Sequence, residues 1–265
     1  MSAATYIYLY CVTQEPPQLE RAGAVDAALY CLAGAGLYAT VSDVPAHEFS
    51  AEQLENNFND LAWLKHHVAR HETAIEALMK ATPVIPFKLA TVFFNEANVQ
   101  SFLEQYAGEL TQKFTELRHK EEWGLKVYCA AEALQASLLL ECDALRDLDQ
   151  QIKAASPGKA YLLGKKKVEV LAVELEHGIG RYRAIFLERL EPLVCATKHL
   201  ELQPRKATGR TDDMILNAAF LVETAKVARF AALVDELAAE FAAKGFAFSS
   251  TGPLPPYNFC HLTER

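Results

Sequence analysis

The sequence predicts an α+β fold, because short β-rich segments and long amphipathic helices alternate along the chain. Residues 5–12, TYIYLYCV, are typical of a strand. A long helix is indicated instead where apolar residues recur at the spacing of one helix face, at Leu61, Leu64, Val68, Ile75 and Leu78. Several strands are apolar on one face only, which favours an antiparallel or mixed sheet in a two-layer arrangement.

The elements after the first strand follow in order. Residues 28–44 predict a β-hairpin that turns at Gly34 and Gly36. A short helix is expected at about 49–57, and the long amphipathic helix at about 60–80.

Residues 82–94, TPVIPFKLATVFF, are β-branched and interrupted by proline, so they predict one or two short strands. Asn95 is then expected to cap a helix whose apolar stripe runs from Val99 to Leu117. Residues 122–130, EWGLKVYCA, predict the strand that closes this half of the chain.

We place a domain boundary near residue 130, which gives domains of residues 1–130 and 131–265. A helical stripe from Leu134 to Ile152 is broken by SPGKA at 156–160, and a further helix is expected at about 159–190. Two helices joined by a short Pro-Gly break predict an antiparallel helical hairpin.

The last part of the chain returns to strands. Residues 192–202 and 214–222 predict two strands, and residues 227–241 predict a helix that ends near Gly245. Residues 246–251, FAFSST, predict a final strand.

Composition and charge restrict the class of protein. The 265 residues carry a net charge of −8, so no broad basic surface indicates nucleic acid or an anionic membrane as a partner. The longest uncharged stretch, residues 27–42, is too short to span a bilayer, and the start of the chain lacks a secretory pattern. The six cysteines are scattered and are expected to be free thiols. A soluble cytoplasmic protein is predicted.

Residues 34–39, GAGLYA, match the dinucleotide-binding pattern GxGxxA. That site needs a helix after the glycines, whereas LYATVSDVP is β-branched and ends in proline. A hairpin turn is the preferred interpretation, and no cofactor is predicted.

His67 and His71 in HHVARHE have the i, i+4 spacing of two metal ligands on one helix. Val68 stands where a metalloprotease has glutamate, and no third ligand is near in the sequence. A hydrogen-bonded, partly buried His71 is therefore preferred over a metal site.

No further motif indicates catalysis. The sequence lacks GxSxG, Walker A and paired-cysteine zinc motifs, and the pair Glu121-Glu122 is expected to be solvated or to cap a helix. The basic run GKKKVE at 164–169 could hold an acidic partner, although a solvated helix face is favoured. No catalytic residue and no metal site is predicted.

The C-terminal segment TGPLPPYNF, residues 251–259, is unusually rigid for a chain end. Its prolines can only end the preceding strand, and Gly252 would permit a sharp turn. Tyr257 and Phe259 are then expected to pack back onto the protein. A structural ending is favoured over a peptide ligand or a catalytic loop.

This segment resembles the ending of gas vesicle proteins of the GvpL/GvpF family, and other parts of the chain are similar in the same order. These parts are residues 36–45, 70–93, 122–127, 158–166 and 217–238. The positions that carry the family pattern, with an expected structural role, are His71, Pro86, Thr91, Trp123, Gly124, Thr251, Gly252, Pro253, Pro255, Pro256, Tyr257 and Phe259. The chain departs from the pattern at Leu89-Ala90, where the family has Phe-Gly, and at Leu254, where it has tryptophan.

The resemblance implies a non-catalytic accessory or minor structural protein of gas vesicle assembly. Its implied partners are the hydrophobic shell protein and other gas vesicle accessory proteins, with no nucleic acid and no membrane. It also implies two α+β domains, the first a ferredoxin-like two-layer sandwich and the second with a long helical hairpin. The alternative is a small-molecule enzyme or ligand-binding protein on the ferredoxin-like domain, which would use His71 and nearby carboxylates.

Overall fold

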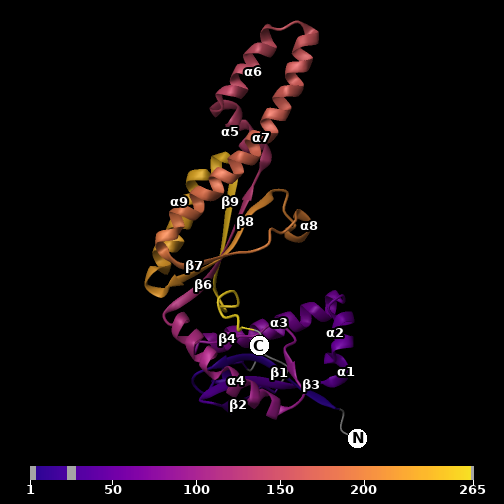
Figure 1. The fold of residues 1–265 in the computed structure, drawn as a ribbon, viewed down its shortest axis with the longest axis vertical. Coiled ribbons are helices and arrows are strands. Elements are labelled where there is room, and N and C mark those ends of the chain that lie inside the picture. The colour runs from indigo at the N-terminus through magenta and orange to yellow at the C-terminus, as the bar shows by residue number, and fades with distance from the viewer. Residues whose placement is uncertain (1–3, 23–27, 264–265) are drawn as a thin grey trace. The chain divides into compact units, whose positions relative to one another are not determined.

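Strand β1 (Thr5–Thr13) is central to the first of two antiparallel sheets in the computed structural model, which describes residues 4–22 and 28–263 (Figure 1). It lies between β3 (Leu37–Pro45) and the short β4 (Ile85–Pro86), and β5 (Val92–Phe93) also pairs with it. β2 (Tyr30–Gly34) pairs with the outer side of β3. The predicted α+β class is confirmed, whereas the described part of this unit has no α-helix between β1 and β2 and so differs from the βαββαβ succession of a ferredoxin-like domain.

The hairpin between β2 and β3 is confirmed, and its turn explains the glycines of GAGLYA. Ala35 and Gly36 both have positive φ, of 52° and 75°, as a two-residue turn of the tight hairpin type requires. Gly34 pairs with Leu37 across this turn. No helix follows the glycines, so the turn does not have the geometry of a dinucleotide site.

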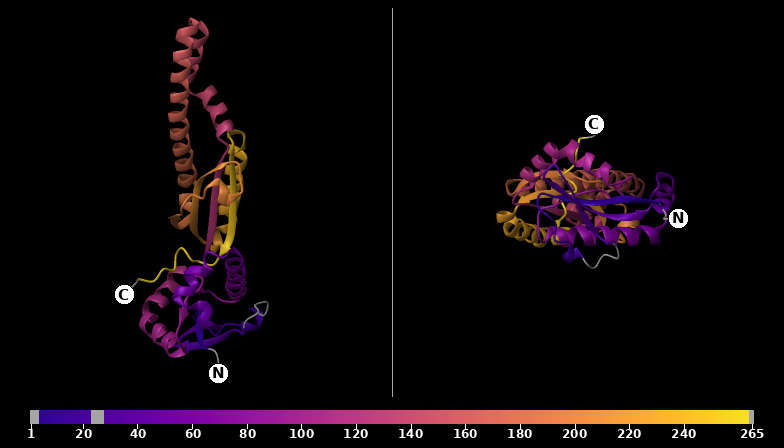
Figure 2. Two further views of the ribbon diagram at one scale, coloured as in Figure 1. Left: turned by 90° about the vertical axis from the view of Figure 1, so that its right-hand side faces the viewer. Right: turned by 90° about the horizontal axis from the view of Figure 1, so that it is seen from below.

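Helices cover both faces of the first sheet, one layer more than the two-layer arrangement that we expected (Figure 2). α3 (Leu61–Met79) packs on the face that carries Tyr8 and Tyr10, whereas Leu103 of α4 (Glu96–Leu117) lies against Gly34 on the other face. The extra layer follows from the sequence of β1, whose residues 7–12 are buried without interruption and therefore need apolar cover on both sides.

The predicted short helix at 49–57 is two helices, α1 (Ala46–Phe49) and α2 (Ala51–Asn57). Ser50 separates them because its hydroxyl accepts the backbone N–H of Gln53 and so caps α2. The cap predicted at Asn95 is confirmed by a 3.0 Å hydrogen bond from the backbone N–H of Asn98.

The buried face of α3 differs from the predicted apolar stripe. Leu61 and Val68 are 70% and 39% exposed, whereas the buried residues of this helix are His67, His71, Ala74, Ile75 and Leu78. The buried face of the helix therefore contains two histidines in addition to Ile75 and Leu78, which the predicted stripe included.

The second sheet has the order β7-β8-β6-β9, from β6 (Lys120–Cys129), β7 (Val194–His199), β8 (Asp213–Glu223) and β9 (Phe246–Leu254). α9 (Val227–Phe241) packs into its core through Phe230 and Leu237, among others. β9 runs three residues beyond the predicted strand and includes Pro253, which an edge strand tolerates.

The predicted helical hairpin is confirmed, with α5 (Ala131–Glu141) and α6 (Asp143–Ala154) forming one arm and α7 (Pro157–Leu190) the other (Figure 1). The first arm is interrupted at Cys142, which has extended backbone angles. α7 runs without a break through its glycines. The remaining short helices are α8 (Arg205–Thr208) and the 3-10 turns Leu19–Ala22, Glu191–Leu193, Thr224–Lys226 and Ala242–Lys244.

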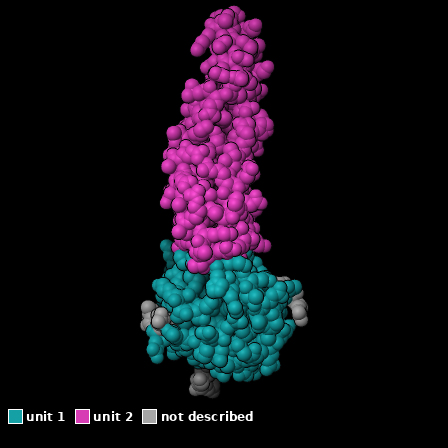
Figure 3. Space-filling view, turned by 90° about the vertical axis from the view of Figure 1, so that its left-hand side faces the viewer, with its two compact units in different colours: residues 1–122, 253–265 teal, residues 123–252 magenta. Residues whose placement is uncertain are grey.

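Packing groups the chain into two compact units, Met1–Glu122 with Pro253–Arg265, and Trp123–Gly252 (Figure 3). In sequence, the second unit is thus inserted into the first. The domains predicted at 1–130 and 131–265 stay a prediction, since packing alone does not say which parts fold independently.

Candidate functional site

The family-pattern residues fall into two groups, one in each compact unit. His71, Pro86, Thr91 and residues 253–259 belong to the first unit, and Trp123, Gly124, Thr251 and Gly252 to the second. In the first unit, the group centres on His71 and Tyr257.

His71 is 2% exposed and both of its ring nitrogens are hydrogen-bonded. Nε2 lies 3.0 Å from the carbonyl oxygen of Phe87, which can only accept, so Nε2 carries the proton and donates. Nδ1 must then accept from the Tyr8 hydroxyl at 2.9 Å. The Tyr8 oxygen in turn accepts the backbone N–H of Ala90 at 3.0 Å. These contacts form one chain of hydrogen bonds that fits a neutral histidine.

Burial lowers the pKa of His71 to about 4, and the hydrogen bond to the Phe87 carbonyl opposes part of this shift. The ring also stacks on Tyr10, with centroids 5.6 Å apart. A cavity beside it, lined by Tyr8, Tyr10, Phe49 and other side chains, has a volume of about 10 Å³, the size of a single water molecule. The hydrogen-bonded, buried histidine preferred from the sequence is the one observed.

His67 does not share a ligand with His71. Its Nε2 lies 3.2 Å from Glu48 Oε1, and its ring packs against Trp63 at a centroid distance of 4.1 Å. Within residues 4–22 and 28–263, no group of three histidine, cysteine or acidic side chains is placed to hold a metal ion.

Ala90 occupies the position at which the resembled family has glycine, and its φ is 61°. It lies in the turn between β4 and β5, where the Thr91 hydroxyl donates to the Lys88 carbonyl at 2.8 Å. The Thr91 carbonyl accepts the backbone N–H of Leu9 at 2.9 Å, which ties this turn to β1. The left-handed backbone explains why glycine suits this position, and here alanine bears the strain.

The C-terminal segment is held to the first unit by three carboxylates, none of which was predicted to bind it. The Tyr257 hydroxyl donates to Glu72 Oε1 at 3.0 Å, and its ring stacks on His71 at a centroid distance of 6.5 Å. Asn258 donates its backbone N–H and its amide group to the two oxygens of Glu122, at 3.0 and 2.6 Å. Thr263 donates twice to Glu109 Oε1, at 2.7 and 3.0 Å.

The expectation that Glu122 is solvated or caps a helix is wrong. Glu122 is only 2% exposed, and this burial raises the pKa of its carboxyl above the usual value. The hydrogen bonds from Asn258 oppose this rise and satisfy the buried oxygens. No local signal in the sequence indicated this burial, because the partner of Glu122 is 136 residues away.

The proline residues set the path of this segment, as predicted. The backbone N–H of Tyr257 donates to the Pro255 carbonyl at 2.7 Å, and that of Phe259 donates to Pro256 at 3.1 Å. Tyr257 packs against the apolar cluster that contains Tyr8 and Ile75, and Phe259 is half-buried.

In the second unit, Gly252 permits a close contact instead of the sharp turn that we expected. It lies within β9, and a Cβ built on it would stand 2.5 Å from Cδ2 of Trp123. No side chain fits at that distance, so the indole of Trp123 and the glycine belong to one packing contact. Thr251 precedes it in β9, and Gly124 follows Trp123 in β6.

These features define a two-sheet α+β protein with a hydrogen-bonded, proline-rich C-terminal segment, and the same fold occurs in solved gas vesicle proteins. The crystal structure of gas vesicle protein GvpF from Anabaena sp. PCC7120 superposes with a TM-score of 0.72 at 19% sequence identity, covering 98% of this chain and all of that one. GvpF from Microcystis aeruginosa gives a TM-score of 0.67 at 19% identity, covering 97% and 99%.

Sequence comparison places the chain within a family. The family model described as gas vesicle synthesis protein GvpL/GvpF matches residues 6–261. Gas vesicle protein L of Streptomyces sp. (strain CB03234) is 27% identical over 284 residues, covering 100% of this chain and 96% of that protein. Gas vesicle protein F of Nostoc sp. (strain PCC 7120) is 28% identical over 176 residues, covering 64% and 68%. The chain belongs to the GvpL/GvpF family of gas vesicle synthesis proteins.

Replacing Ala90 by glycine should raise the free energy of unfolding by up to about 1 kcal/mol. A left-handed alanine costs about 1–2 kcal/mol, and the greater freedom of glycine in the unfolded chain offsets part of the gain. Urea unfolding measures the change, and Ala69→Gly on the exposed side of α3 should instead destabilise by about 1 kcal/mol. A loss of stability in Ala90→Gly would show that methyl packing outweighs backbone strain.

Replacing His71 by glutamine should remove a pH dependence of stability between pH 6.5 and 4. The folded-state pKa of His71 is about 4, below the unfolded value of 6.5, so wild type is fully stabilised above pH 6.5 and loses stability as the pH falls. Between pH 6.5 and 4, the free energy of unfolding of wild type should fall by about 3 kcal/mol more than that of the variant. Urea unfolding at several pH values measures it, and the exposed His66→Gln control should keep the wild-type profile. Parallel wild-type and His71→Gln profiles would contradict the assignment.

Replacing Tyr257 by alanine should lower the free energy of unfolding by about 2–3 kcal/mol, because a half-buried ring and its hydrogen bond to Glu72 are lost. Tyr257→Phe keeps the ring and should lose only about 1 kcal/mol. Partner affinity per folded molecule should be unchanged in both variants. Weakened binding with intact stability would make this segment a binding site.

Proposed function

We propose that this protein is a non-catalytic assembly factor or minor structural component of gas vesicles, which binds the hydrophobic shell protein and other gas vesicle proteins. The observation that carries the proposal is the match to a family of gas vesicle synthesis proteins over residues 6–261. We further propose that the protein acts in the cytoplasm and at the gas vesicle, and needs no cofactor, nucleic acid or membrane. No helix in the described part of the chain is long and apolar enough to cross a bilayer.

The surface chemistry supports this role. A small, strongly apolar shell subunit aggregates unless its exposed surface is covered before it joins the wall. A partner with a net charge of −8 would keep such a complex dispersed. The helical hairpin exposes large apolar side chains that could provide cover, at Leu140, Tyr161, Leu162, Val168 and Val173.

The family-pattern residues have structural roles in this proposal. His71, Thr91 and Tyr257 belong to hydrogen-bonded packing within the first unit, and Trp123 with Gly252 forms a close packing contact in the second. The alternative of a small-molecule enzyme centred on His71 has less support, because both ring nitrogens are hydrogen-bonded and the adjoining cavity has room for about one water molecule.

A pull-down with the shell protein tests the proposal. The full-length chain should retain the shell protein or another protein of the same gas vesicle gene cluster, whereas an unrelated protein of similar size and net charge should not. The intact chain is needed because cutting at residue 130 would separate Glu122 from Asn258 and leave a buried carboxylate without its donors. Deleting the gene should leave cells without normal vesicles. Failure to bind any shell or accessory component would overturn the proposed function.

A further inference from the structure

The outward half of α7 between Lys159 and Val168 combines lysines with exposed apolar side chains, and we call it the α7 patch. Its members are Lys159, Tyr161, Leu162, Lys165, Lys166 and Val168. Tyr161, Leu162 and Val168 are 63%, 66% and 68% exposed. Residues 150–168 contain five lysines, and the exposed Glu169 follows Lys165 and Lys166 by one helical turn, in a chain whose net charge is −8. The patch is thus a basic, partly apolar area on an acidic protein.

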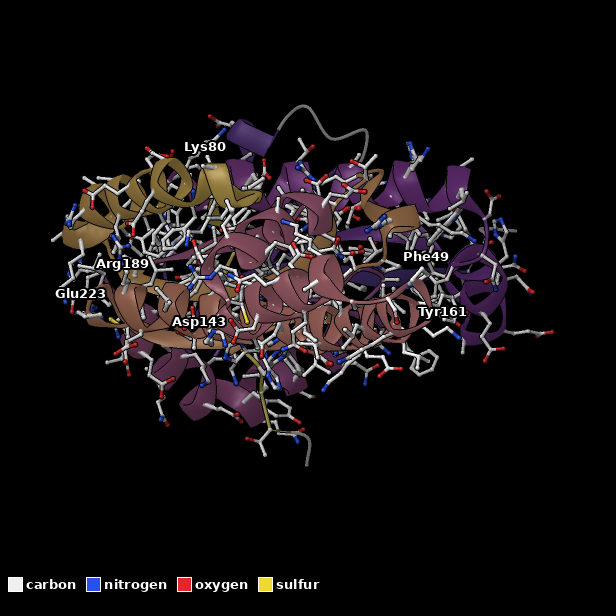
Figure 4. The ribbon with its side chains drawn as sticks, turned by 90° about the horizontal axis from the view of Figure 1, so that it is seen from above. Phe49, Lys80, Asp143, Tyr161, Arg189 and Glu223 are labelled. Carbon is white, nitrogen blue, oxygen red and sulfur yellow. The ribbon has the colours of Figure 1, made fainter. Side chains whose placement is uncertain are left out.

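The opposite face of α7 already has its partners within the hairpin. Val170, Leu171 and Leu175 pack against the core of the second unit, and Lys167 forms an ion pair with Asp149 of α6. The patch side chains point away from these contacts, and Figure 4 shows the Tyr161 ring projecting outward.

The lysines of the patch are not neutralised by neighbours. Lys165 lies over the Tyr161 ring at 5.0 Å, one helical turn away, so the ring and the charge are presented together. Among the described residues, no ion pair is found for Lys159, Lys165 or Lys166, whereas Lys113, Lys226 and Lys244 each have one. Tyr161 and Leu162 are adjacent and both more than 60% exposed, so they add apolar area beside these charges.

We propose that the α7 patch binds an acidic amphipathic helix of a partner protein. Apolar residues of that helix would cover Tyr161, Leu162 and Val168, and its flanking carboxylates would pair with Lys165 and Lys166. Opposite charge and the i, i+4 spacing of the patch both favour a helix laid along α7. The inference rests on the proposed function, in that the protein acts by binding other proteins.

An anionic membrane fits the same patch less well. The exposed Glu169 and Glu176 follow on the same helix, and lysines separate the apolar groups, so α7 lacks the broad apolar face of an interfacial helix.

The test uses the full-length protein and a labelled synthetic peptide helix with leucines at i, i+3 and i+4 spacing and glutamates elsewhere. Fluorescence anisotropy should show binding that weakens severalfold between about 0.05 and 0.3 M salt, because the contacts are between exposed charges. Lys165→Glu with Lys166→Glu should weaken binding at least tenfold, and Tyr161→Ser with Leu162→Ser should weaken it severalfold. Lys65→Glu in α3 with Lys80→Glu directly after it, both at exposed positions, makes the same charge change and should bind as wild type does. Circular dichroism checks that every variant keeps its helix content.

Equal peptide binding by wild type and the Lys165/Lys166 variant would overturn the inference, as would the absence of peptide binding. Preferential binding to phosphatidylserine vesicles over the peptide would overturn it in favour of a membrane surface. The same variants are then compared in the shell-protein pull-down. If wild type binds the peptide but no gas vesicle protein, the proposed function fails while the patch inference stands. If both proteins retain the shell protein equally but differ in peptide binding, the proposed function stands and the patch serves another partner.

Discussion

The return of the C-terminal segment to the first unit is the constraint on which much of this structure depends. Glu122 is buried immediately before the chain enters the second unit, and a buried carboxylate is costly unless hydrogen bonds satisfy it. Asn258, which follows the exit from the second unit, supplies two of those bonds. Entry and exit of the inserted unit are therefore joined by one buried polar contact, and Tyr257 continues that contact to Glu72 and the His71 ring.

This arrangement separates what holds the fold from what is free to bind. His71 and the prolines of the C-terminal segment are engaged in hydrogen bonds and packing within the protein. Exposed apolar side chains occur on α7, whose inner face packs within the second unit, and also on the first unit, for example at Leu61 and Phe94.

Sequence patterns predicted the helices and strands well, but they predicted less well which faces of these elements are buried. The extent of β1, the tight turn at Gly36 and the cap at Asn95 depend on neighbours a few residues away, and all three are confirmed. The buried face of α3 was misjudged at Leu61 and Val68, which are exposed, and at His67, which is buried, whereas the burial of His71 was expected. The need for cover on both faces of the first sheet was also missed.

Periodicity and ordered motifs are local properties, so the α+β class, the helical hairpin and the family could be inferred from residue patterns alone. The burial of Glu122, the contact between Gly252 and Trp123 and the left-handed backbone of Ala90 could not. Each of these depends on a contact or a dihedral angle imposed by distant parts of the chain, such as the 136 residues between Glu122 and Asn258. Residue spacing indicates which side chains lie on the same face of a helix or strand, but it does not identify the residues that pack against that face.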